Sequence, residues 1–244
     1  MYKINFDKVI NRKNTNCSKW DNAKKRLNAD IDLPLWVADM DFQSPPEVIK
    51  TLCKYAAHGI YGYTYIPDEY YKTIIEWNRK KHFWDIPQEH ILFSPGVVIS
   101  LKTLVQAFTK PGDNIIIQSP IYPPFYSSIS SNERRILVNP LIIRDGRYHI
   151  DFNDFEKKIK DKKTTMFLLC SPHNPVGRVW NKEELTRMGK LCVKHNVFVV
   201  SDEMHSDLVY KPFKHIPFPT ISKKISMISA VCSAPGKTFN LAGL

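Results

Sequence analysis

Five short apolar runs, separated by longer amphipathic stretches, constrain the fold of this 244-residue chain more than any other feature. The runs occupy residues 91–93, 114–117, 164–170, 197–200 and 226–231. Strands that are apolar throughout and alternate with amphipathic helices are typical of a parallel sheet buried on both faces. We therefore expect an α/β fold with a mostly parallel central sheet flanked by helices.

The stretches between the runs predict helices. The clearest runs from Asn181 to His195, because Asn181 and Glu184 have the spacing of a capping box. A helix from Pro45 is expected to bury Val48, Leu52 and Tyr55. Other helices are expected up to Trp77, over residues 97–108 and over residues 152–160, and a turn at residues 144–147 predicts a hairpin.

Composition excludes several classes of protein. The chain has 35 Lys and Arg against 24 Asp and Glu, a net charge of +11, but the basic residues are scattered and no nucleic-acid-binding motif accompanies them. No window is apolar enough to cross a membrane, and residues 1–7 lack the apolar core of an export signal. Five widely spaced cysteines without a CxxC pair argue against a disulfide scaffold or a zinc ribbon. A cytoplasmic protein that binds neither membrane nor nucleic acid is expected.

Chemistry-bearing residues follow four of the apolar runs. In parallel sheets ligands bind beyond the carboxyl ends of the strands, so these segments are expected to surround one crevice. They are residues 94–98, 171–177, 201–205 and 233–238.

Each candidate also has an ordinary structural interpretation. Gly96 lies in a turn between an apolar run and a predicted helix, and the free N–H groups at the start of that helix suit a phosphate. A turn of this kind is also common where no ligand binds. Neither a Walker motif nor GxGxxG is present. Asn174 could form an Asx turn or donate to a ligand. Asp202 could cap a helix or face a cationic group, with His205 one turn on. Lys237 could be a surface charge or an amine nucleophile in an apolar crevice.

Taken together, the motifs resemble the fold-type I enzymes of the aminotransferase class I/II superfamily, which use pyridoxal 5′-phosphate (PLP). More narrowly they resemble the MalY/PatB cystathionine β-lyases and the cysteine lyase cystalysin. The matching stretches, in family order, are residues 35–42, 62–64, 170–180, 201–207 and 236–243. The resemblance implies the large domain of that fold over residues 46–244, preceded by an N-terminal arm over residues 1–45.

The resemblance also implies a role for each candidate residue. Lys237 and Tyr122 would be catalytic: Lys237 would bind PLP as a Schiff base and move the substrate α-proton, and Tyr122 would stack on the ring. Asp202 would face the pyridine nitrogen. The remaining cofactor contacts would come from Asn174, His205, Gly96, Val97, Val98, Ser233 and Tyr63 of the partner subunit, while Ala38 and Asn174 would lie near the substrate.

The implied reaction is α,β-elimination on cystathionine or an L-cysteine-type substrate, carried out by a homodimer without a metal. An aminotransferase and a non-catalytic regulatory protein that retains the fold remain alternatives. Gly236 replaces the family's serine, so weaker cofactor binding is expected. Because relatives continue into a small C-terminal domain beyond the position of Leu244, we also expect a truncated chain with an exposed strand edge and impaired activity.

Overall fold

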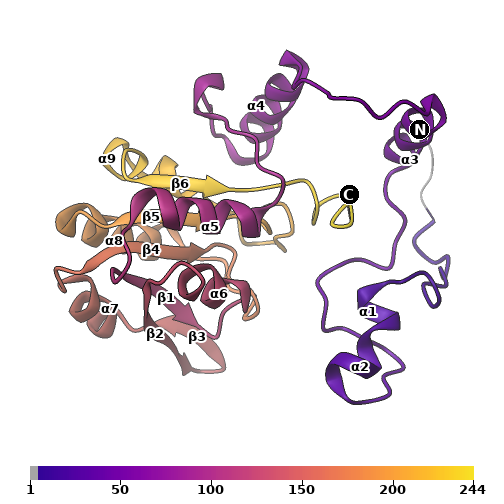
Figure 1. Ribbon diagram of the computed structural model, residues 1–244. Helices are drawn as coiled ribbons and strands as arrows, with labels where there is room; N and C mark the ends of the chain where they lie inside the picture. Colours follow the sequence, from indigo (N-terminus) through magenta and orange to yellow (C-terminus); the bar gives the residue numbers. More distant parts are fainter. Residues whose placement is uncertain (1–4) are drawn as a thin grey trace. The chain divides into compact units, whose positions relative to one another are not determined.

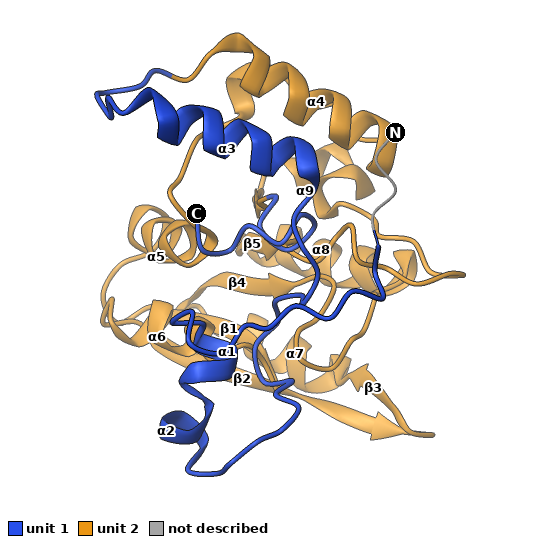
Figure 2. Cartoon of the chain, turned by 90° about the vertical axis from the view of Figure 1, so that its right-hand side faces the viewer, with its two compact units in different colours: residues 1–65, 235–244 blue, residues 66–234 orange. Residues whose placement is uncertain are grey.

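The computed structural model describes residues 5–244, which divide into two compact units (Figure 2). Unit 1 comprises residues up to 65 together with residues 235–244, and unit 2 comprises residues 66–234. Residues 1–4, part of the segment in which no export signal was found, lie outside the described residues. The expected boundary between an arm and a large domain at residue 45 stays a prediction.

Unit 1 is built from three helices and extended chain. The helices are α1 (Ser18–Asp21), α2 (Ala23–Leu27) and α3 (Pro46–His58). Pro46 occupies the first turn of α3, where its missing N–H costs no hydrogen bond, and Gly59 ends the helix in the left-handed conformation that glycine adopts freely.

Unit 2 contains a six-stranded sheet in the order β3-β2-β1-β4-β5-β6 (Figure 1). All neighbouring strands are parallel except the hairpin pair at one edge, β2 and β3. The strands are β1 (Asn114–Ser119), β2 (Arg135–Arg144), β3 (Arg147–Ile150), β4 (Thr164–Cys170), β5 (Phe198–Asp202) and β6 (Ser229–Cys232). The mostly parallel α/β sheet is therefore confirmed.

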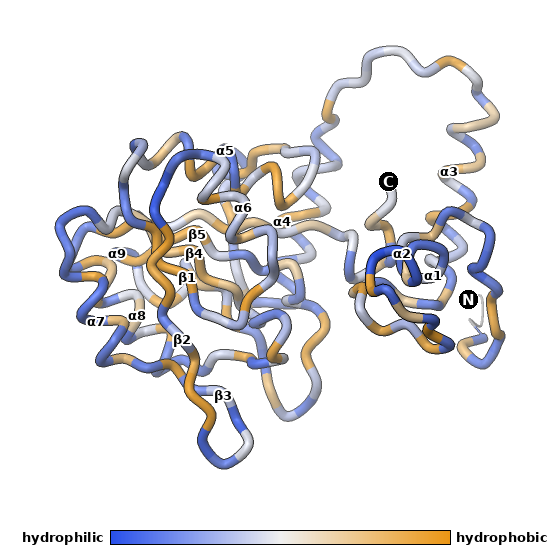
Figure 3. The backbone as a smooth tube through the Cα atoms, turned by 60° about the horizontal axis from the view of Figure 1, so that its bottom comes forward, coloured by the Kyte–Doolittle hydropathy of each residue, from blue (hydrophilic) through white to orange (hydrophobic). Residues whose placement is uncertain are grey.

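Helices cover both faces of this sheet. One apolar cluster joins the strands to α5 and α6, and the other joins them to α7, α8 and α9. Figure 3 shows the hydrophobic colour concentrated on β1, β4 and β5. The unit's helical elements are α4 (Asp68–His82), η1 (Gln88–His90), α5 (Val97–Phe108), α6 (Pro124–Ser130), α7 (Phe152–Ile159), α8 (Lys182–His195), η2 (Phe218–Ile221) and α9 (Lys223–Ser226).

Local signals explain the best-predicted elements. Asn181 accepts a hydrogen bond from the Glu184 N–H at 2.8 Å, and the Glu184 carboxylate accepts one from the Asn181 N–H at 2.9 Å. This is the expected capping box at the start of α8. The expected hairpin is also present, since Arg144 pairs with Arg147 across the β2–β3 turn.

Two expectations are wrong. Residues 91–93 form no strand, and the side chains of Leu92 and Phe93 are exposed because no neighbouring strand pairs with this segment. The helix from Pro45 is present as α3, but it buries no residue: Leu52 and Tyr55 are exposed. The buried apolar clusters of the described residues are formed by side chains of unit 2, so no such core covers a face of this helix.

Candidate functional site

The carboxyl ends of three adjacent strands are aligned in unit 2. Cys170 at the end of β4 pairs with Asp202 at the end of β5, and Asp202 pairs with Cys232 at the end of β6. Backbone hydrogen bonds continue past the strands, from the Ser171 N–H to the Asp202 carbonyl and from the Glu203 N–H to the Cys232 carbonyl, both 2.9 Å. The segments with Asn174, Asp202 and Ser233 therefore leave the sheet at the carboxyl ends of its parallel strands. We call this end of the sheet the strand-end edge, as distinct from the lateral edges formed by β3 and β6.

Tyr122 lies beside the Asn174 segment. The Tyr122 N–H donates to the Asn174 carbonyl at 3.2 Å, which ties the loop after β1 to the loop after β4. The backbone N–H of Asn174 in turn donates to the Cys170 sulfur at 3.3 Å. Tyr122 is 40% exposed, so its ring is free to cover a ligand at this edge.

Two consecutive carboxylates stand at the end of β5: Asp202 is its last residue and Glu203 follows it. The alternation of side chains along the strand sends them to opposite faces. Asp202 is 7% exposed, and its Oδ1 accepts the Met204 N–H at 3.1 Å. Glu203 lies on the same side as Ser201, whose hydroxyl donates to its Oε1 at 2.9 Å. Asp202 thus lies at the carboxyl ends of the parallel strands, and Glu203 turns into the protein.

Glu203 belongs to a buried polar cluster that the sequence analysis missed. Its carboxylate also contacts His215 Nε2 at 2.7 Å and accepts the Phe218 N–H at 2.9 Å. The His215 ring lies edge-on to His82, 5.3 Å between centroids, and His82 Nε2 lies 2.9 Å from Asp207. The sequence did contain a signal for this cluster. Glu203 directly follows Asp202 at the strand end, so its side chain points to the opposite face.

The thiols that flank Asp202 are kept neutral. Burial is the main cause and the nearby Asp202 carboxylate the second. Together they raise the pKa of Cys170, and they raise the pKa of Cys232 to about 12. His173 is also buried: burial lowers its pKa, and its Nε2 lies 2.9 Å from the Pro120 carbonyl. These shifts keep all three groups uncharged at neutral pH.

The helix α5 directs its N-terminus to the same edge. Helix α5 is followed directly by β1, so it runs antiparallel to the parallel strands. Its N-terminus therefore lies at the end of the sheet where those strands finish (Figure 1). Gly96 is its N-cap residue, no side chain caps the first turn, and open space lies where a side chain on Gly96 would point. The backbone N–H groups of the first turn of α5, which starts with Val97 and Val98, are therefore positioned for an anion.

The other predicted residues lie in different places. His205 is half-buried just beyond β5, and Ser233 is exposed just beyond β6. Lys237, Ala38 and Tyr63 belong to unit 1. Within that unit the Lys237 ε-amine donates to the Ala38 carbonyl at 2.5 Å, while Tyr63 is fully exposed.

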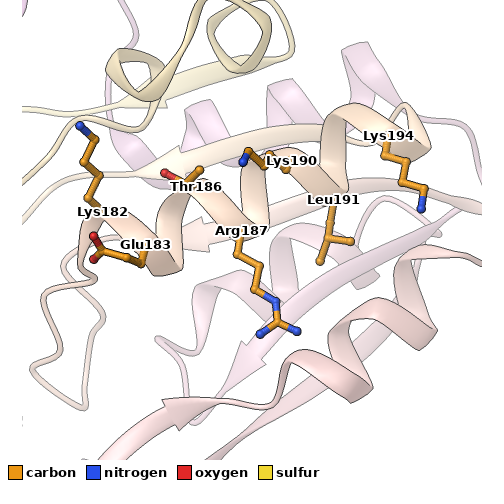
Figure 4. Close-up of a pocket in the computed structure, with 7 residues that line it drawn as sticks. All are labelled: Lys182, Glu183, Thr186, Arg187, Lys190, Leu191 and Lys194. Carbon is orange, nitrogen blue, oxygen red and sulfur yellow. The ribbon is translucent and has the colours of Figure 1, made fainter.

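A surface hollow runs along α8 (Figure 4). No predicted site residue lines it, and four of its seven side chains are basic, which is typical of a solvated helix face. They are Lys182, Glu183, Thr186, Arg187, Lys190, Leu191 and Lys194. Among residues 5–244, no group of three His, Cys, Asp or Glu side chains could hold a metal ion, and no helix is long and apolar enough to cross a membrane.

The family model of aminotransferases class I and II matches residues 31–244, most of both units. The chain belongs to this family. It is 48% identical to cystathionine β-lyase PatB of Bacillus subtilis and 31% identical to protein MalY of Escherichia coli, over 99% of its length in both comparisons. It also resembles the crystal structure of cystalysin from Treponema denticola, which contains PLP, with a TM-score of 0.94 and 41% identity over 99% of the chain.

This member of the aminotransferase class I and II family spans only part of its relatives. It covers 62% of PatB, 61% of MalY and 62% of the cystalysin chain. The resemblance expected from the motifs is confirmed, and so is the fold.

Proposed function

We propose that this chain carries the PLP-binding part of a carbon–sulfur lyase that acts on cystathionine or a related L-cysteine derivative. Elimination would release a thiol, and one water would convert the remainder to pyruvate and ammonia. The observation that carries the proposal is the 48% identity to cystathionine β-lyase PatB across 99% of this chain. A cytoplasmic location is part of the proposal, because five free cysteines suit a reducing compartment.

The residues present fit the functional groups of PLP. A phosphate suits the uncapped N-terminus of α5, and a protonated ring nitrogen suits the buried Asp202 carboxylate. The ring hydroxyl can accept from the side-chain amide of Asn174. An aldehyde needs an amine nucleophile, which is the role we assign to Lys237.

When bound, PLP supplies an electron sink for the substrate's α-carbon. Lys237 would hold the aldehyde of PLP through its amine, and the same amine would accept the substrate's α-proton. Asp202 would keep a proton at the ring nitrogen, and Tyr122 would contact the ring. The other assigned contacts are Asn174 and His205 at the ring, Gly96, Val97, Val98 and Ser233 at the phosphate, and Ala38 near the substrate.

A product assay tests the reaction class. Given PLP and cystathionine, the chain is expected to release pyruvate and ammonia without consuming an added 2-oxo acid. Asp202→Asn should lower the rate about 100-fold or more, as loss of one electrostatic stabiliser commonly does. Glu76→Gln, which breaks an exposed ion pair on α4, serves as the control and should not change the rate. Consumption of the 2-oxo acid without ammonia would instead identify an aminotransferase.

We further propose that the protein acts as a homodimer in which Tyr63 of the partner subunit contacts the phosphate. The support is an exposed apolar run in unit 1, since contiguous exposed apolar surface marks interaction sites. This run consists of Ile60, Tyr61, Tyr63 and Tyr65. Light scattering should give twice the mass of one chain, and Tyr63→Ala should weaken PLP affinity; a monomer with unchanged affinity would contradict the dimer.

A further inference from the structure

Two cationic side chains in unit 1, Arg12 and Lys19, bind the segment that follows Ala38 and carries Asp39 and Asp41. Arg12 reaches Asp39 at 2.9 Å and Asp41 at 2.7 Å. Lys19, only 3% exposed, reaches Asp41 at 2.5 Å, Asp39 Oδ1 at 3.2 Å and the Asp39 carbonyl at 3.0 Å. We call Arg12, Lys19, Asp39 and Asp41 the ionic clasp. Two cations face two anions, so the buried Lys19 amine is compensated.

Asn240 fastens the Lys237 segment to the same loop. Its Nδ2 donates to the carbonyls of Met40 and Phe42, both at 3.0 Å, and its Oδ1 accepts the Met40 N–H at 3.1 Å. The Asn240 carbonyl also accepts from the Ser44 hydroxyl at 3.2 Å. Asn240 has a φ of 57°, in the left-handed region where asparagine is enriched.

The clasp and Asn240 fix both partners of the Lys237–Ala38 hydrogen bond. Ala38 directly precedes Asp39, and Lys237 lies three residues before Asn240. The ε-amine therefore meets the Ala38 carbonyl at 2.5 Å through two segments about 200 positions apart in the sequence. A carbonyl that accepts from an ammonium favours the protonated form of that amine.

We propose that Arg12, Lys19 and Asn240 are positioning residues that hold the Ala38 carbonyl against the ε-amine of Lys237 and thereby set the balance between its protonated and nucleophilic forms. This inference rests on the proposed function, in which the same amine condenses with PLP and carries the substrate proton. Loosening the loop removes an acceptor from the ammonium, so more of the amine is unprotonated at a given pH.

Acylation of Lys237 in the full chain, without added PLP, measures this balance. A limiting amount of an acylating reagent is applied over a pH series, and labelling of each lysine is quantified by peptide mass spectrometry. Arg12→Gln and Asn240→Gly should each raise labelling of Lys237 at neutral pH by roughly 3- to 10-fold, the factor expected for one hydrogen bond. Glycine keeps the positive φ at position 240 accessible.

The exposed Lys24–Asp30 pair of the same unit supplies the matched control. These side chains are 76% and 81% exposed, and Asp30→Asn should leave Lys237 labelling unchanged. If Arg12→Gln does not fold, Asn240→Gly decides the question. Unchanged labelling of Lys237 in the folded variants would overturn the inference, and so would an equal rise at every lysine, which indicates general loosening.

A second arm separates this inference from the proposed function. With PLP added, the pH midpoint of visible absorbance should shift in Arg12→Gln relative to the unaltered chain and to Asp30→Asn. If Lys237 labelling changes as expected but no chain forms a coloured adduct with PLP, the positioning inference stands and the proposed function fails. If the coloured adduct forms with the same midpoint in every variant, the positioning inference fails and the proposed function stands.

Discussion

At the residue scale, neighbouring carboxylates acquire different roles from their surroundings. Asp202 lies at the strand-end edge and Glu203 lies in the interior, with three donors from Ser201, His215 and Phe218. These donors join the end of β5 to the segment that leads into η2. Glu203 therefore holds the strand end that carries Asp202.

Removing the Glu203 carboxylate should destabilise the fold. Glu203→Ala leaves its buried donors without an acceptor, so the free energy of unfolding should fall by about 3–5 kcal/mol. Urea denaturation followed by circular dichroism measures this loss. Glu76→Ala removes an exposed carboxylate instead and should cost less than about 1 kcal/mol. Equal effects of the two substitutions would contradict the role assigned to Glu203.

The ionic clasp should make stability depend on acid pH. Burial alone would raise the pKa of Asp41, but hydrogen bonds from Lys19, Trp20 and Arg12 lower it to about 2, against an ordinary 3.8. A folded-state pKa below the unfolded value stabilises the fold above the unfolded pKa, and that stabilisation is lost as pH falls through the folded one. Stability should therefore decline between about pH 4 and pH 2.

Thermal unfolding at pH 5, 4, 3 and 2 checks this expectation. In Asp41→Asn the midpoint temperature should fall less steeply over that interval, because the titrating group is gone. Asp30→Asn, which alters the exposed pair in the same unit, should keep the original slope. A slope in Asp41→Asn that matches the unaltered chain would show that the clasp does not control the acid response.

At the element scale, helix α8 depends on a residue that is unfavourable within helices. Gly189 is buried in its middle, and a Cβ there would lie 2.4 Å from Ile225 Cδ1 and 2.9 Å from its Cγ1. Alanine usually favours a helix over glycine by about 1 kcal/mol. Here the close approach of α9 requires the glycine.

Gly189→Ala should therefore lower stability, because overpacking commonly costs about 1–3 kcal/mol and outweighs the gain in helix propensity. The double variant with Ile225→Val removes the nearest methyl group and should recover part of the loss. Urea denaturation of both single variants and the double variant gives the coupling energy. Additive effects would show that the two residues do not collide.

The accuracy of the sequence prediction also varied with the element. The runs at 114–117 and 164–170 became buried central strands, because apolar runs bounded by turns leave little choice of environment. The run at 91–93 has the same composition but no neighbouring strand, which composition alone does not reveal. Strand-end residues such as Asp202 were predictable because the sheet topology aligns them.

The contacts of unit 1 were not predictable in the same way. Arg12 and Asp39 are 27 positions apart, and Met40 and Asn240 are 200 positions apart. These residues belong mainly to irregular segments. Because such segments lack the regular side-chain periodicity of helices and strands, the sequence pattern does not show which of their residues will be in contact. Arg12, Lys19 and Asn240 therefore emerge only from the structure.

At the scale of the whole molecule, the fold places side chains from distant parts of the sequence at one edge of the sheet. Asp202 ends one of three adjacent parallel strands, Asn174 and Ser233 follow the other two, and α5 begins at the same edge. The chain spans 62% of PatB, so the activity of its relatives stays a proposal for this chain. PLP binding through Lys237 is the central claim of that proposal.

Reduction of the PLP-treated chain with borohydride, followed by peptide mass spectrometry, tests this claim most directly. Borohydride converts the carbon–nitrogen double bond between PLP and an amine into a stable single bond, so the attachment site survives digestion. We predict a yellow solution that loses its colour on reduction, with the adduct on the peptide that contains Lys237. Lys237→Ala should carry none. An adduct spread over surface lysines, and unchanged in Lys237→Ala, would contradict the account.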